Sequence, residues 1–186
     1  PLLFREGKLP LQKAEKSKSI MVVGGGLAGM QAAILMAERG HKVSLHEKSA
    51  GMGGQWTIAA NVPGKERFND FTAYLERSLK KAGVKAKMKS ELTSDDIIEK
   101  KPDAVIIATG AVPSIIPVKG IDGKNVVQAI DVITGKAKPK GKCVVIGGRF
   151  IGLEVALLLA EQDKEATIVT KALLGENGSK LERMTY

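Results

Sequence analysis

The chain has 186 residues, of which 44% are hydrophobic and only 4% aromatic, and its formal net charge is +9. This length suits one large or two small domains, and no apolar run reaches the roughly 18 residues of a membrane span, so we expect no membrane partner. The lysines and arginines are scattered without the interleaved aromatic side chains that base stacking requires. This pattern favours a solvated basic surface over nucleic-acid binding, and such a surface attracts anionic nucleotides or an acidic electron-transfer partner.

Residues 1–18 are polar and lysine-rich, and they predict a linker or an arm that lies on a neighbouring part of the protein. The chain opens with Pro1 rather than Met, from which we expect a piece of a longer polypeptide. It carries no secretory signal, which favours a cytoplasmic location.

The first chemical motif follows an apolar strand predicted at residues 20–23. Three glycines come next with the spacing of a dinucleotide-binding turn, at Gly24, Gly26 and Gly29. Gly24 permits a tight strand-to-helix turn, Gly26 lets a pyrophosphate approach the backbone, and Gly29 lets the helix pack close to the sheet. The start of the predicted helix presents free N–H groups and a partial positive charge to the phosphates.

The predicted helix runs through Arg39 and stops at Gly40, and a second strand at residues 42–46 ends on Glu47. An acid at this distance from the glycines accepts hydrogen bonds from an adenosine ribose. The strand, glycine turn, helix and terminal acid together predict a βαβ dinucleotide site. The alternative is a strand-to-helix turn that binds nothing.

The middle of the chain continues the alternation of strands and helices. Residues 49–64 predict a long glycine-rich loop, and a helix is predicted at 66–82. A third strand at 84–88 follows, and Ser94 is expected to cap a short helix through residue 99. The apolar run at 103–108 predicts a strand in the centre of a parallel sheet.

The opening pattern recurs after a connector. Residues 111–140 are rich in proline and glycine and predict a crossing segment with short strands. A strand at 143–146, a turn at 147–152, a helix at 153–162 and a strand at 166–169 then repeat the first unit. A single strand–helix–strand unit buries its own apolar faces poorly, so the second domain looks truncated.

The remaining reactive residue types predict no further chemistry. Cys143 is the only cysteine, and we interpret it as a buried strand residue because one thiol forms neither an internal disulfide nor a zinc site. His41 and His46 flank one predicted strand without a partner of metal-ligand spacing, so we expect both to be structural or exposed. No catalytic residue and no metal site is assigned.

The two glycine motifs, with Ala108-Thr109-Gly110 between them, resemble flavoproteins that have two dinucleotide-binding domains. The segments at 22–29, 38–43, 52–55, 62–66 and 102–113 are most similar to the C-terminal half of NADH:flavin oxidoreductases. This group contains 2,4-dienoyl-CoA reductase, trimethylamine dehydrogenase and 2-enoate reductase. The resemblance covers about residues 19–175. It implies an α/β fold with a Rossmann-like FAD-binding domain and the start of a second, truncated NAD(P)-binding unit.

The resemblance also implies a division of the chain and a set of cofactors. The implied parts are an arm (1–18), a domain for FAD or ADP (19–115), a connector (116–140) and a truncated NAD(P)-binding unit (141–186). FMN and an iron–sulfur cluster are expected only in an N-terminal barrel portion outside this chain. That remainder of the polypeptide is the expected partner, and we expect the chain alone to hold FAD poorly and to be inactive.

Site residues carry over by position. Those assigned to FAD are Gly24, Gly26, Leu27, Ala28, Gly29, Glu47, Lys48, Gly54, Gln55, Leu92, Ala108, Thr109 and Gly110. Those assigned to NAD(P)H are Gly147, Gly148, Gly152 and Glu154.

The second glycine motif departs from the family pattern at two positions. Arg149 replaces the middle glycine, where its side chain either blocks the pyrophosphate or pairs with it. Thr170 replaces the acid that many members use for the NADH ribose, which leaves NADPH open as the donor. The leading hypothesis is therefore an oxidoreductase portion that passes electrons between NAD(P)H and FAD. The alternative is a non-catalytic module that holds ADP or FAD structurally.

Overall fold

The computed structural model describes residues 10–171, which form two compact units. The first unit contains residues 10–57 and Phe68–Ala111. The second contains Ile58–Arg67 together with residues 112–171. The segment 58–67 is therefore continuous in the chain with the first unit at both ends, although its contacts group it with the second.

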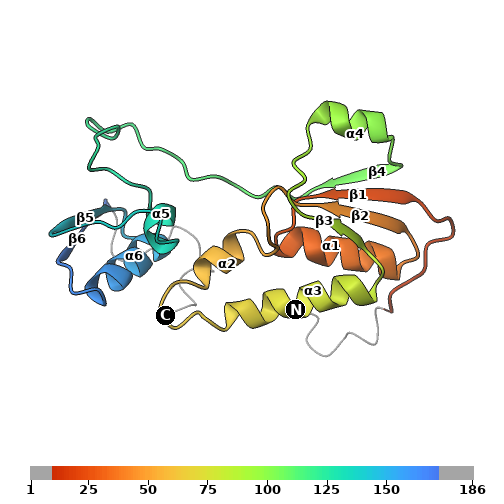
Figure 1. The fold of residues 1–186 in the computed structure, drawn as a ribbon, viewed down its shortest axis with the longest axis horizontal. Helices are drawn as coiled ribbons and strands as arrows, with labels where there is room; N and C mark the ends of the chain where they lie inside the picture. The colour runs from red at the N-terminus through yellow and green to blue at the C-terminus, as the bar shows by residue number, and fades with distance from the viewer. Residues whose placement is uncertain (1–9, 172–186) are drawn as a thin grey trace. The chain divides into compact units, whose positions relative to one another are not determined.

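Four parallel strands form the sheet of the first unit, in the order β3-β2-β1-β4 (Figure 1). They are β1 (Ser19–Val23), β2 (Lys42–His46), β3 (Lys85–Lys87) and β4 (Ala104–Ile107). Ile20 of β1 pairs with Val43 on one side and with Ala104 on the other. The α/β fold with a parallel sheet is confirmed.

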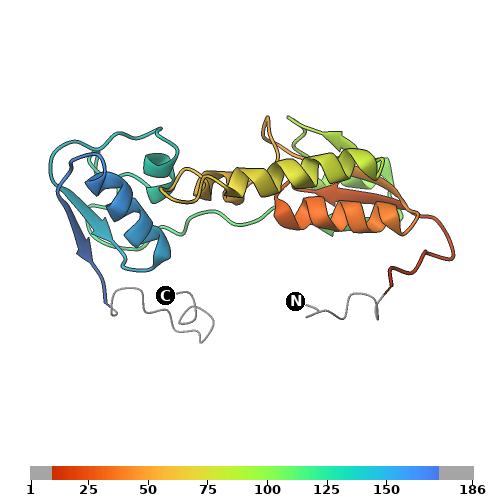
Figure 2. The same cartoon turned by 90° about the horizontal axis from the view of Figure 1, so that it is seen from below.

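Helices α1 (Leu27–Glu38) and α3 (Phe68–Lys81) lie side by side over one face of this sheet (Figures 1 and 2). The shorter α4 (Ser94–Lys100) lies beyond β4, away from both (Figure 1). Within residues 10–171, no helix is long and apolar enough to cross a membrane.

The core of the first unit lies between the sheet and these two helices. Its strand residues alternate along β1 and β2, as expected for side chains that share one face of a sheet. Val22 and Leu45 of the strands and Met30 and Ala33 of α1 have no exposed surface. Burial of each larger side chain stabilises the fold by about 1.5–3 kcal/mol.

Strand β4 lies at the edge of the described sheet, so the prediction of a central strand at 103–108 is wrong. Ile106 packs against the core, whereas Val105 and Ile107, on the opposite face, are 36% and 64% exposed. An apolar run indicates that both faces of a strand are hydrophobic. It does not report how many strands lie beside it.

The predicted loop at 49–64 contains a short helix, α2 (Gln55–Ala59). The Thr57 hydroxyl donates to the Gly54 carbonyl (2.8 Å), and the Trp56 indole N–H donates to the Phe68 carbonyl (2.9 Å). The Trp56 ring stacks on Phe68 with centroids 4.0 Å apart. These non-local contacts hold the turn of helix in place, which local sequence did not indicate.

Helix α4 is capped by Thr93 rather than by Ser94. The Thr93 hydroxyl accepts from the Asp96 N–H (3.3 Å), and the Asp96 carboxylate accepts from the Thr93 N–H (2.8 Å). This reciprocal pair is a capping box, and it satisfies two donors at the helix start. The signal Thr93-x-x-Asp96 was present in the sequence, one residue before the predicted cap.

The second unit is smaller. Its two parallel strands, β5 (Cys143–Ile146) and β6 (Ala166–Val169), pack against α6 (Phe150–Ala160) and α5 (Ala129–Ile133). The predicted connector therefore contains helix α5, and it has no strand among its described residues. Helix α6 also begins at Phe150, three residues before the predicted start.

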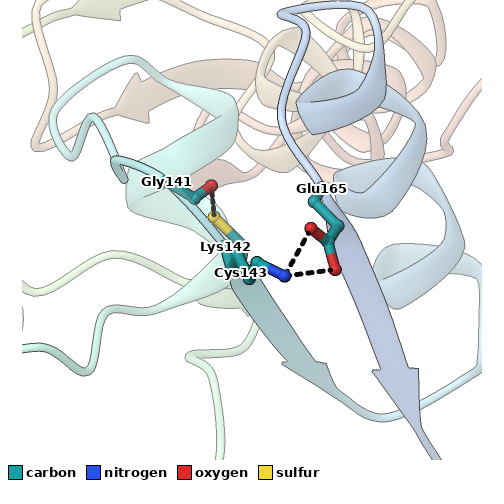
Figure 3. Close-up of polar contacts among 4 residues, drawn as sticks. All are labelled: Gly141, Lys142, Cys143 and Glu165. Atoms are coloured by element: carbon teal, nitrogen blue, oxygen red, sulfur yellow. Dashed lines mark hydrogen bonds and ion pairs between the residues drawn. The ribbon is translucent and has the colours of Figure 1, made fainter.

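Figure 3 shows the amino ends of β5 and β6, where an exposed ion pair joins the two strands. The Lys142 ammonium lies 3.0 Å from Glu165 Oε2. Beside it, the Cys143 thiol donates to the Gly141 carbonyl at 3.7 Å and is half-buried, less than we predicted for a buried strand cysteine. In a strand with only one neighbour, the chain supplies less cover for this side chain.

Candidate nucleotide-binding sites

The first glycine turn lies at the carboxyl end of β1, where Gly24 has a φ of +110°. Its N–H donates to the His46 carbonyl of β2 (2.8 Å). A Cβ at Gly24 would lie 2.2 Å from the Ala108 carbonyl oxygen, and one at Gly29 would lie 1.9 Å from the Gly24 carbonyl oxygen. Glycine is therefore required at both positions, and α1 starts as close to the strand as its backbone allows.

The surroundings of Gly26 differ from those of Gly24 and Gly29. It is the N-cap of α1 with φ −70° and ψ 179°, a conformation that any residue adopts. A Cβ here would meet nothing within 4 Å, so the glycine leaves open space in front of the helix. No side chain caps α1, and its first turn contains no acidic residue. The free N–H groups of the helix start therefore remain available to an anion.

Glu47, at the end of β2, is buried and holds the glycine turn. Its Oε2 accepts from the Gly25 N–H (2.6 Å) and its Oε1 accepts from the Ser49 N–H (2.7 Å). Burial raises the pKa of Glu47, but the N–H donors of Ser49 and Gly25 and the charge of Lys48 outweigh it, so the pKa lies below its ordinary value. Each carboxylate oxygen keeps a lone pair that is free for a ribose hydroxyl.

A second glycine segment completes the first site. The Gly53 N–H donates to the Gly25 carbonyl (2.8 Å), and a Cβ at Gly54 would lie 3.3 Å from the Gly26 Cα. Gln55 Nε2 donates to the Ala111 carbonyl (2.5 Å). The structure thus brings together three predicted segments, those around Gly26, Gly54 and Thr109-Gly110.

Sequence reasoning missed two glycines of this arrangement. A Cβ at Gly25 would lie 2.5 Å from Met52 Sδ and 2.9 Å from Glu47 Cβ. Gly53 has a φ of +102°, and a Cβ there would lie 2.3 Å from a Thr57 methyl carbon. The signal for both was the run of adjacent glycines, three at 24–26 and two at 53–54, since Gly25 and Gly53 lie directly beside predicted site residues.

The other residues assigned to the first site lie on or next to the elements that carry the glycine turn and Glu47. Leu27 and Ala28 open α1, and Lys48 is exposed directly after Glu47. Leu92 is half-buried between β3 and α4. The backbone two residues before it is tied to β2, because the Ser90 N–H donates to the Glu47 carbonyl (2.8 Å).

His46 is buried, and its Nδ1 lies 2.8 Å from Ser90 Oγ in a hydrogen bond. This contact confirms a structural role for His46. Burial and the charges of Lys87 and Lys100 lower the pKa of His46. Within residues 10–171, no three His, Cys, Asp or Glu side chains are grouped so that they could hold a metal ion.

The second glycine turn repeats the backbone of the first. Gly147 has a φ of +116°, and its N–H donates to the Val169 carbonyl (2.8 Å). A Cβ at Gly152 would lie 1.9 Å from the Gly147 carbonyl oxygen. Arg149 is the N-cap of α6 with φ −84° and ψ −177°, nearly the angles of Gly26. Gly148 lies buried between them.

Glu154 of α6, assigned by position to NAD(P)H, forms an ion pair with Lys65. Lys65 belongs to the segment 58–67, whose contacts group it with the second unit. The carboxylate therefore has a cationic partner from a distant part of the chain, and sequence spacing did not indicate this partner.

Each unit has a pair of parallel strands, and the carboxyl end of one strand leads through a glycine turn into a helix without a side-chain cap. This arrangement defines a dinucleotide-binding protein of the Rossmann-like class. Residues 18–174 match the family model described as "Pyridine nucleotide-disulphide oxidoreductase", and the chain belongs to this family.

Individual relatives agree with the group indicated by the sequence motifs. The chain is 42% identical over 174 residues to an NADH oxidase of Thermoanaerobacter brockii, covering 91% of this chain and 27% of that protein. It is 39% identical over 170 residues to a cinnamate reductase of Clostridium sporogenes, covering 91% and 25%. A solved structure of 2-naphthoyl-CoA reductase matches with a TM-score of 0.81 and 38% identity, covering 86% and 24%. The chain spans about a quarter of the length of these relatives, and the resemblance to the NADH:flavin oxidoreductase group is confirmed.

Proposed function

We propose that this chain is the nucleotide-binding portion of a larger flavin-dependent oxidoreductase. The first unit holds FAD, and the second binds NAD(P)H. The observation that carries the proposal is the open space at Gly26, which faces an uncapped helix start and is flanked by the Glu47 carboxylate. A helix start without a side-chain cap, beside an acid held by two hydrogen bonds, matches the pyrophosphate and ribose of an adenine dinucleotide.

The residues of the chain bind and orient rather than react. The α1 N–H groups and the backbone at Gly26 hold the pyrophosphate of FAD, and Glu47 accepts from the ribose hydroxyls. Gly54, Gln55 and Thr109-Gly110 border the cofactor on its flavin side, and the Leu92 backbone lies at the adenine. When bound, the nicotinamide supplies a hydride and the flavin accepts it, so the chain needs no acid or base of its own.

The remainder of the polypeptide is the proposed partner. The relatives are about four times longer than the matched region, which supports a longer parent polypeptide. By the family resemblance, we propose that its other portion contains an FMN barrel and an iron–sulfur cluster. Electrons would leave the first unit towards that portion.

The test uses the full-length protein that contains this chain. Gly26→Val fills the space that the pyrophosphate needs without a change of backbone angles, so the purified variant should contain far less FAD than the wild type. Gly51→Val is the matched control, because a Cβ at Gly51 also meets nothing within 4 Å. The flavin is released from the protein, FAD is separated from FMN by chromatography, and FAD is then quantified by its absorbance. Equal FAD content in wild type and Gly26→Val would contradict the proposal, and bound ADP in place of FAD would favour the non-catalytic alternative.

A further inference from the structure

The carboxyl end of β6 carries no acid at the position where the first unit has Glu47. In the first unit the Gly24 N–H donates to the His46 carbonyl, and Glu47 follows His46. In the second unit the Gly147 N–H donates to the Val169 carbonyl at the same distance, 2.8 Å, and Thr170 follows Val169. The hydrogen-bond register therefore places Thr170 at the position of Glu47.

Two exposed cations lie at this end of the second unit. Lys171 follows Thr170 and is exposed, and Arg149 is exposed at the start of α6. No hydrogen bond or ion pair within residues 10–171 engages either side chain. Both cations are therefore available to a ligand that approaches the carboxyl ends of β5 and β6.

The two changes act in the same direction on one chemical group. A carboxylate at the end of this strand accepts from a ribose 2′-hydroxyl and repels a 2′-phosphate, which carries a charge of about −1.5 to −2. A threonine removes this repulsion, and a neighbouring cation adds attraction. Rossmann-type sites that take the phosphorylated nucleotide place a basic side chain here.

We propose that the second unit selects NADPH over NADH, with Lys171 pairing with the 2′-phosphate and Thr170 leaving room for it. This inference rests on the proposed function, since it presumes that the second unit binds a pyridine nucleotide. Arg149 has a separate part. It lies at the start of α6, where the pyrophosphate binds, and both nucleotides have a pyrophosphate, so Arg149 raises the affinity for both without selecting between them.

The test compares the oxidised nucleotides, which bind without reducing the flavin. Isothermal titration of the full-length protein should give an affinity for NADP⁺ at least roughly tenfold higher than for NAD⁺, equal to about 1.4 kcal/mol. Thr170→Glu should remove this preference. Lys171→Met should lower NADP⁺ affinity by roughly tenfold and leave NAD⁺ affinity unchanged. The pair 2′,5′-ADP and 5′-ADP repeats the comparison without the nicotinamide.

The matched control is Lys142→Met. It removes the same charge from the same two-stranded sheet, but at the amino ends of the strands, where Lys142 pairs with Glu165 (Figure 3). The ratio of NADP⁺ to NAD⁺ affinity should not change in this variant. Arg149→Gly should lower both affinities by the same factor and also leave the ratio unchanged.

Each contrary outcome identifies which statement is wrong. Equal or tighter binding of NAD⁺ to the wild type overturns the selection of NADPH and leaves the proposed nucleotide site intact. A preference for NADP⁺ that survives in both Thr170→Glu and Lys171→Met overturns the residues assigned. If neither nucleotide binds, the inference and the proposed role of the second unit both fail.

Discussion

The two glycine turns share one backbone and differ in their surroundings. Gly24 and Gly147 have φ values of +110° and +116°, and each donates to the neighbouring strand at 2.8 Å. A Cβ at Gly24 would collide with the Ala108 carbonyl at the end of β4, whereas one at Gly147 would meet nothing within 4 Å. The turn is therefore specified locally, by a strand, a glycine spacing and a helix. In the first unit, the end of β4 adds a steric constraint on the turn, and the second unit has no strand in that position among its described residues.

The strands that lead into the two turns make the same point. Four of the five residues of β1 are buried, and the strand has a neighbouring strand on each side and α1 packed against it. In β5 the burial alternates, and Val144 and Ile146 are 66% and 58% exposed. Two apolar strands of similar composition thus differ in burial according to what lies around them.

The largest expected effect breaks this comparison at its glycines. Gly24→Ala should destabilise the first unit by about 3 kcal/mol or more, because it adds a collision with backbone to the strain of a positive φ. Gly147→Ala should cost the second unit about 1–2 kcal/mol, from strain alone. Urea unfolding measures both.

Two signals separate the units in that experiment. Trp56 is the single tryptophan and belongs to the first unit, so its fluorescence follows that unit, while circular dichroism follows both. Gly29→Ala and Gly152→Ala are matched controls, since each would place a Cβ 1.9 Å from a carbonyl oxygen. Equal losses for Gly24→Ala and Gly147→Ala would refute the role given to β4.

The second prediction concerns the cation that distinguishes the second turn. Because Arg149 is proposed to pair with the pyrophosphate, Arg149→Gly should weaken the binding of pyridine nucleotides by about 1.5–3 kcal/mol, a factor of ten or more. A variant that binds more tightly than the wild type would show instead that the side chain blocks the position. Titration of both proteins with NADP⁺ and NAD⁺ decides between the two.

Acid should lower the stability of the first unit through Glu47. The second unit has Thr170 at this position and therefore no carboxylate to protonate there. The folded-state pKa of Glu47 lies below its ordinary value of 4.5, so its contribution to stability is complete above pH 4.5 and is lost as the pH falls through the folded value. The stability gap between wild type and Glu47→Gln should therefore narrow below pH 4.5. A gap that stays constant from pH 7 to pH 3 would contradict the hydrogen bonds assigned to this carboxylate.

The smallest expected effect concerns a buried hydroxyl without a hydrogen-bond partner in the described part of the first unit. The Thr72 hydroxyl is buried and has no hydrogen-bond partner among the described residues. Thr72→Val replaces it with a methyl group of similar shape, which should be neutral or should stabilise the unit by up to about 1 kcal/mol. Thermal unfolding measures this, and a clear loss of stability would show that the hydroxyl has a partner such as a bound water.

Sequence patterns predicted the elements whose determinants are local. The bounds of β2, β5 and β6 match the predicted strands. Strands β5 and β6 are mostly apolar runs and β2 alternates polar with apolar residues, and both patterns are local. Contacts between distant residues escaped prediction, as with Trp56 on Phe68, which anchors α2. The position of β4 at an edge also escaped, since hydrophobicity does not encode strand order.

The candidate site divides in the same way. The glycine spacing and Glu47 could be predicted as candidate site residues from the sequence, because the role proposed for each follows from its own chemistry. The bond from Gly25 to the Glu47 carboxylate was not readable, since it depends on how β2 lies beside β1. The ion pair of Glu154 with Lys65 was hidden for the same reason.

That ion pair also has a consequence for the order of events during synthesis. Lys65 and Glu154 are 89 residues apart, and a ribosome that adds about 5–20 residues per second needs about 5–20 s to cover that distance. Throughout this time Ala60 and Val62, which are buried in the finished structure, lack the second unit against which their segment groups. The segment 58–67 is therefore accessible to proteases and chaperones during this interval, and a truncation after residue 111 would leave it without these contacts permanently.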